Sequence, residues 1–187
     1  AVYDFGLGAG FYLNASEPPW RQHYRMESYV VDELPTLLGE IEELDLSKSA
    51  ICGHSMGGHG AITLALKYPG RYASVSAFSP ICAPASCPWG EKAFMHYLGP
   101  DRSTWRNHDA SELIRDGATL PPLLIDQGGA DAFLQEQLKP KLLLDACRDH
   151  GVSLSYRLHE GYDHSYFFIA SFMEDHLRFH ASHLGLG

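Results

Sequence analysis

The chain has 187 residues, of which 45% are hydrophobic and 20% are charged, and this balance excludes a mostly disordered protein. At about 150 residues per domain, the length predicts a single domain over 1–187. The net charge of −9 argues against nucleic acid or anionic lipid as a partner, because both repel an acidic surface. No uncharged apolar run reaches about 18 residues and no secretory signal is visible, so we expect no membrane partner.

Helices and strands are expected to alternate along the chain. Apolar spacing predicts a helix over 24–43, which Pro35 should kink or end early. Further strands are expected at 49–52, 72–78, 123–126 and 152–158, and further helices at 61–66, 133–150 and 165–182. Between them, 82–118 is expected to be irregular with short helical pieces and to form an insertion over one end of the sheet. This order predicts an α/β protein with a mainly parallel sheet, helices on both faces and a site along one edge.

Two patterns suggest other sites but do not fit them. The glycines of 6–10 lack a preceding strand and a following Lys-Ser/Thr, so a ligand-facing loop is a better interpretation than a phosphate loop. Cys82 and Cys87 are separated by four residues, and no second pair completes a zinc site. We therefore expect free thiols in a reducing cytosol, and no metal.

The pattern Gly-x-Ser-x-Gly at 53–57 is the strongest catalytic signal in the chain. A predicted strand ends at Gly53 and a helix begins after Ser55, as a nucleophile elbow requires. In such an elbow the N–H of Met56 would point at the forming oxyanion. The alternative is a glycine-rich turn with an incidental serine.

A serine nucleophile needs a base, and His164 is the candidate among 11 histidines. It follows the last predicted strand and precedes the last helix, which is the position that hydrolase chain order demands. His54 and His59 flank the elbow and are expected to pack locally. The alternative for His164 is a histidine that caps its loop. His176, His180 and His183 are expected on the last helix, with their side chains in solvent or near its negative end. Other candidates are expected at the ends of helices and strands.

The acid that orients the imidazole is expected to be Asp131, in the loop after the strand at 123–126. Asp126 is a competitor, but it lies within the strand itself. Asp163 adjoins the histidine and is expected to shape its loop. The order Ser55, Asp131, His164 is that of the α/β-hydrolases.

With these residues in place, the chain resembles the S-formylglutathione hydrolase (esterase D) family of the α/β-hydrolase superfamily. The resemblance covers nearly the whole chain, and its last block is the most specific. It rests on residues 4–12, 23–26, 53–61, 76–82, 87–90, 125–128 and 161–168.

The resemblance implies hydrolysis of S-formylglutathione to glutathione and formate, the closing step of formaldehyde detoxification. It further implies action on small acyl esters, no cofactor, a cytoplasmic location and a homodimer. By matching position, Ser55 is the nucleophile, Asp131 the acid and His164 the base. Met56 is the oxyanion donor, and Trp89 is a wall near the acyl pocket.

Members of this family are longer at the N-terminus, where they carry several strands, an early helix and the loop with the second oxyanion N–H. The chain is then part of a longer enzyme or a shortened protein. We expect the first, because shortening would expose a long apolar sheet edge. A missing oxyanion donor typically costs about 10²–10³ in kcat, so a weakly active or inactive chain is an alternative. A general short-chain carboxylesterase and a catalytically dead binding module are the others.

Overall fold

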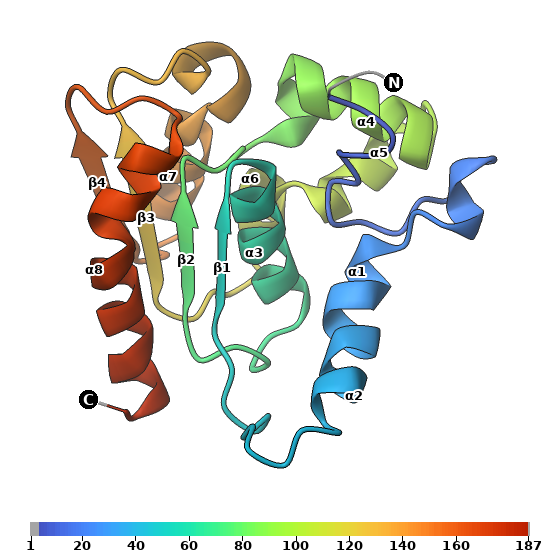
Figure 1. Ribbon diagram of the computed structural model, residues 1–187. Helices are drawn as coiled ribbons and strands as arrows, with labels where there is room; N and C mark the ends of the chain where they lie inside the picture. The colour runs from blue at the N-terminus through green and yellow to red at the C-terminus, as the bar shows by residue number, and fades with distance from the viewer. Residues whose placement is uncertain (1–3, 187) are drawn as a thin grey trace.

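The computed structural model describes residues 4–186, and its centre is a four-stranded sheet (Figure 1). All neighbouring strands are parallel and follow chain order, so the predicted parallel sheet of about four strands is confirmed. Their bounds are β1 Ile51–His54, β2 Val75–Phe78, β3 Leu123–Gly128 and β4 Ser155–His159.

The first strand lies later than the sequence predicts. A strand was expected over 49–52, but β1 extends to His54 because Gly53 and His54 pair with Ala77 and Phe78 of β2. Glycine disfavours strands locally, so only pairing with a neighbour could reveal this extension.

The helices surround the sheet and the N-terminal loop. The segment 82–118, which was predicted to be irregular with short helical pieces, contains the 11-residue helix α4, which is longer than that prediction. Its apolar residues pack against the N-terminal loop, and this contact is not visible in local sequence. The bounds are α1 Met26–Ser28, a π-helical turn Tyr29–Glu33, α2 Leu34–Leu38, α3 Met56–Lys67, α4 Pro88–Leu98, α5 Arg102–Trp105, α6 Ala110–Arg115, a π-helical turn Leu134–Leu138, α7 Pro140–Asp149 and α8 Tyr166–Leu184.

Two prolines shape these helices differently. Pro35 does not end the first helix: the chain passes through a π-helical turn. Pro35 has no N–H to donate to the Val31 carbonyl, and the Arg71 guanidinium donates to that carbonyl instead. Pro140, by contrast, splits the helix predicted over 133–150. Lys139 precedes it in the left-handed region, with a φ of +47°, and separates the π-helical turn Leu134–Leu138 from α7.

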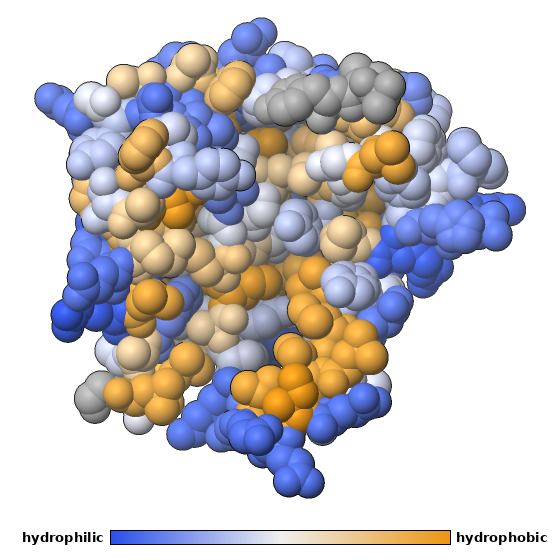
Figure 2. All heavy atoms as spheres, viewed as in Figure 1, coloured by the Kyte–Doolittle hydropathy of each residue, from blue (hydrophilic) through white to orange (hydrophobic). Residues whose placement is uncertain are grey.

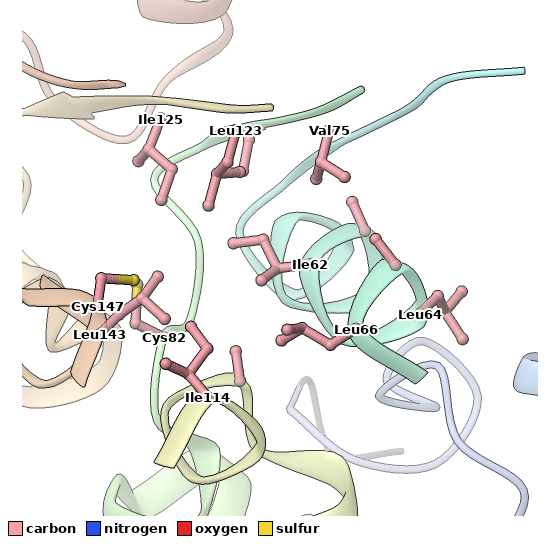
Figure 3. Close-up of a cluster of buried hydrophobic side chains, with 14 of the residues drawn as sticks. Ile62, Leu64, Leu66, Val75, Cys82, Ile114, Leu123, Ile125, Leu143 and Cys147 are labelled. Atoms are coloured by element: carbon pink, nitrogen blue, oxygen red, sulfur yellow. The ribbon is translucent and has the colours of Figure 1, made fainter. Parts of the chain in front are cut away.

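The sheet is covered on both faces, as predicted. One face packs against α3, α6 and α7 through side chains such as Ile62, Ile114 and Leu143, which meet Val75 and Ile125 of the strands (Figure 3). Alternate strand residues point to the opposite face, where α8 lies. This alternation places mostly polar and aromatic side chains under α8, with Leu124 as an aliphatic exception.

The histidines of α8 correct a second expectation. His176 and His180 were expected in solvent, but both are buried against the sheet. His176 stacks on Phe78 at 3.8 Å between ring centroids, and the His180 ring lies 2.7 Å from the hydroxyls of Ser74 and Ser76. The small serines of β2 leave room for imidazoles there, a complementarity that spacing along one helix cannot reveal.

β1 forms one edge of the described sheet, and Cys52 on it is exposed. Apolar atoms gather on the same side of the molecule, over α2 and the segment before β1 (Figure 2). The exposed large apolar residues of that region are Leu37, Ile41, Leu44 and Leu46. No helix within residues 4–186 is both long enough and apolar enough to cross a bilayer.

Candidate active site

Ser55 occupies the sharp turn between the last residue of β1 and the first residue of α3. Its φ is +56° and its ψ is −117°, a backbone conformation that is strained for a residue with a side chain. The turn is held by Ser55 N–H, which donates to the Phe78 carbonyl at 2.9 Å. Gly53 is required here, because a Cβ on it would lie 2.1 Å from the Gly57 carbonyl oxygen. The geometry is that of a nucleophile elbow.

His164 and Asp131 come from the loops that follow β4 and β3, and their side chains meet. The Nδ1–H of His164 donates to Asp131 Oδ2 at 2.6 Å. The other carboxylate oxygen accepts the N–H of Phe133 at 2.9 Å. The carboxylate thus holds the imidazole by Nδ1 and leaves Nε2 available, which is the orientation that a general base needs.

Burial and hydrogen bonding act in opposite directions on Asp131. Its side chain is fully buried, which by itself raises the pKa. Hydrogen bonds from His164 and from the Phe133 N–H outweigh burial and hold the pKa of Asp131 below its usual value. The carboxylate is therefore ionised at neutral pH and can stabilise a charged imidazole.

Two aromatic rings enclose the imidazole of His164. Phe133 contacts it edge-on at 5.1 Å between centroids, and His54 lies tilted against it at 4.4 Å. Burial, followed by the neighbouring His164, lowers the pKa of His54 to about 4, so His54 is neutral at pH 7. Sequence reasoning missed Phe133 as a wall, and its position two residues after Asp131 was the only available signal.

Ser55 and His164 line the same open cavity, of about 860 Å³, which runs along β1. Within the described part of the chain, no hydrogen bond joins the Ser55 hydroxyl to the imidazole. Catalytic hydrogen bonds of this kind are often loose without substrate and tighten when it binds. The structure therefore brings the two side chains to one cavity without joining them.

A second, small cavity of about 110 Å³ opens directly beside Ser55. Trp89 and Ile81 form part of its wall, together with Met56 of the elbow. Trp89 also packs on Phe133, with 4.8 Å between ring centroids. A space of this size admits only a small acyl group.

The glycine-rich loop of residues 6–10 closes the same cavity from above, where Gly8 and Ala9 line it. Tyr97 of α4 holds this loop: its hydroxyl accepts from the Gly6 N–H at 3.1 Å and donates to the Ala9 carbonyl at 2.8 Å. The role of Tyr97 carried no signal in the sequence, because 88 residues separate it from Ala9.

The competing carboxylates lie elsewhere. Asp126 is inside β3 and faces α8, where Arg157 donates to both of its oxygens at 2.6 Å. Asp163 is exposed and accepts the Ser165 N–H at 2.9 Å within its own loop. Neither hydrogen-bonds to His164, so Asp131 is the carboxylate that orients it.

A parallel sheet in this strand order, with a serine on a strained strand–helix turn and a loop histidine backed by an aspartate, defines the α/β-hydrolase class. Comparison with known proteins agrees. Residues 1–179 match the model of the family described as "Putative esterase". The chain therefore belongs to this esterase family.

Two relatives are S-formylglutathione hydrolases of Rattus norvegicus and Mus musculus, 53% identical over 184 and 185 residues. Each match covers 97% of this chain and 65% of the relative, so the chain spans about two thirds of their length. A solved S-formylglutathione hydrolase from Agrobacterium tumefaciens superposes with a TM-score of 0.95 at 53% identity, covering 97% of this chain and 66% of that one.

Proposed function

We propose that the chain carries the catalytic centre of a serine thioesterase that hydrolyses S-formylglutathione to glutathione and formate. Ser55 is the nucleophile, His164 the general base and Asp131 the acid that orients it. The observation that carries this proposal is the 2.6 Å contact between His164 and Asp131 at the cavity that Ser55 lines. The names of the relatives at 53% identity support the substrate.

In the proposed mechanism, His164 Nε2 takes the hydroxyl proton of Ser55 while the oxygen attacks the formyl carbonyl. The N–H of Met56, at the first residue of α3, stabilises the oxyanion together with the positive end of the helix. The thiolate of glutathione leaves with the proton from the imidazole. Water then attacks the formyl ester through the same base and releases formate.

The small cavity beside Ser55 supports a formyl or acetyl group as the acyl part. Its wall includes Trp89, which would limit the length of the acyl chain. A general short-chain carboxylesterase uses the same residues and differs only in the leaving group. The ratio of kcat/KM for S-formylglutathione to that for p-nitrophenyl acetate distinguishes the two.

The proposal is tested by labelling the folded chain with a fluorophosphonate probe. We expect covalent labelling that disappears in Ser55→Ala. Ser47→Ala is the matched control, because Ser47 is an exposed serine that hydrogen-bonds only to Asp45. A folded chain that is not labelled, or labelling that survives Ser55→Ala, would contradict the proposed nucleophile and favour a binding module without activity.

Formaldehyde detoxification, a cytoplasmic setting and a homodimer are the further consequences that we propose for the whole enzyme. We also propose that residues 1–187 form one catalytic domain and that segment 82–118 covers its active site. The relatives are about half as long again as this chain. We propose that a protein extended at the N-terminus supplies the second oxyanion donor and turns over p-nitrophenyl acetate about 10²–10³ times faster. Equal turnover by the two proteins would contradict this.

A further inference from the structure

A third cavity adjoins the two cavities that Ser55 lines, and the proposed mechanism leaves it unused. It is a groove of about 720 Å³ between the glycine-rich loop and the start of the first helix. Gly8 and Met56 line this groove, the small acyl cavity and the cavity along β1 alike. A molecule bound at Ser55 can therefore extend past these two residues into the groove.

The groove contains an unpaired cation. Four basic side chains have no hydrogen bond or ion pair with any residue of 4–186, namely Arg21, Arg25, Lys48 and Lys139. Of these, Arg25 alone lines a cavity that shares residues with the cavities that Ser55 lines. In a chain with a net charge of −9, this guanidinium is the group available to an anion beside the nucleophile.

The backbone that carries Arg25 is fixed by hydrogen bonds on both sides. The Ala15 N–H donates to the Tyr24 carbonyl at 2.8 Å, and the Met26 N–H donates to the Leu13 carbonyl at 3.1 Å. Because this backbone is already fixed, the protein loses less conformational entropy when a ligand binds to Arg25.

The cavity along β1 does not offer the same chemistry. No Lys or Arg lines it, and its walls include the apolar Val30, Ile51 and Leu64. Of its two histidines, His54 is neutral at pH 7, and His164 already has Asp131 as the partner of its Nδ1. A carboxylate placed there would lose water without gaining a cation, which is unfavourable.

We propose that the groove binds the leaving group of the thioester, an anionic peptide-like thiol such as glutathione, with one of its carboxylates on the Arg25 guanidinium. This inference rests on the proposed function and names the leaving-group subsite of that same site. The sulfur lies between Ser55 and His164, and the peptide passes over Gly8 and Met56. Glu33 also lines the groove and favours a thiol that carries an ammonium group over a purely anionic one.

The test measures binding of S-methylglutathione, a thioether with no acyl group to cleave, by titration calorimetry on the full chain. We expect Arg25→Gln to weaken binding about tenfold, the range of a charge-assisted hydrogen-bonded pair. Arg21→Gln is the matched control: Arg21 is an unpaired arginine that does not line the groove. The dimethyl ester of S-methylglutathione should show a much smaller difference between Arg25→Gln and the parent chain.

A kinetic measurement on the same variants gives a second readout. The ratio of kcat/KM for S-formylglutathione to that for p-nitrophenyl acetate should fall about tenfold in Arg25→Gln, through KM, and stay constant in Arg21→Gln. Equal binding of S-methylglutathione by Arg25→Gln and the parent chain, or no binding by the parent at millimolar concentration, would overturn the subsite.

Fluorophosphonate labelling of Ser55 is measured on the same samples to separate the two proposals. If Ser55 is labelled but Arg25→Gln binds S-methylglutathione as tightly as the parent chain, the subsite alone is rejected. Absence of labelling in the folded chain rejects the proposed function as well.

Discussion

Replacing Asp131 by asparagine tests the proposed triad most directly, because the surrounding hydrogen bonds determine how the new amide must sit. The Phe133 N–H points at Oδ1 from 2.9 Å and requires an oxygen there. The amide NH₂ of asparagine then takes the place of Oδ2, where it faces His164 Nδ1. Gln127 donates to Oδ2 at a longer 3.4 Å, and the Ser79 hydroxyl, which also hydrogen-bonds to this carboxylate, can accept as well as donate, so little opposes this orientation.

In that orientation the amide donates to Nδ1, and the imidazole must carry its proton on Nε2. An Nε2–H cannot accept the hydroxyl proton of Ser55. The fully buried carboxylate charge that would stabilise the imidazolium is lost as well. The analogous change in other serine hydrolases costs about 10⁴ in kcat, or about 5 kcal/mol of transition-state stabilisation. We expect Asp131→Asn to lower kcat by this amount while the chain stays folded.

The assay is the rate of fluorophosphonate labelling of Ser55, measured beside p-nitrophenyl acetate turnover, because labelling detects even a slow nucleophile. Asp163→Asn is the matched control: it removes an adjacent carboxylate that contacts only its own loop. We expect it to retain the parent rates. A loss below about tenfold in Asp131→Asn, or an equal loss in Asp163→Asn, would refute this account of the acid.

Three further predictions follow from particular contacts. Gly53→Ala should destabilise the chain by about 3 kcal/mol in urea unfolding, because its Cβ would lie 2.1 Å from the Gly57 carbonyl; unchanged stability would contradict the elbow geometry. Trp89→Ala should raise kcat/KM for p-nitrophenyl butyrate relative to the acetate about tenfold; an unchanged ratio would remove Trp89 from the acyl wall. Burial opposes ionisation of Asp126, but close contacts with His176 and His159 and the hydrogen bonds from Arg157 lower its pKa to about 2. Because this pKa is depressed in the folded state, Asp126→Asn should cost about 2 kcal/mol at pH 7, and the difference from the parent should vanish as pH falls from 4 to 2; a pH-independent difference would refute it.

The sequence alone was sufficient for the order of elements. Period-two and helical patterns, together with glycine and proline at their ends, predict four strands and the helices between them because these signals are local. Predictions from these signals were weakest where contact with a neighbouring segment sets the bounds of an element. One example is β1, which includes Gly53 and His54 only because they pair with β2. The same holds for α4, whose apolar residues face the N-terminal loop.

The sequence also placed Ser55, Asp131 and His164 on loops at one edge of the sheet, because parallel strands bring their carboxyl ends to one edge. It could not say which carboxylate touches the imidazole. Only the fold shows that Asp126 is turned to Arg157 under α8, whereas Asp131 lies 2.6 Å from His164.

What the tertiary structure alone decided is the set of contacts between segments far apart in the chain. Tyr97 holds the glycine-rich loop over Ser55, and Arg25 remains unpaired in the groove beside it. The buried histidines of α8 were assigned to solvent for the same reason: the partners of His180 are Ser74 and Ser76, about 100 residues earlier in the chain. Periodicity along a chain reports which face of an element is apolar, but which group meets that face depends on packing between elements.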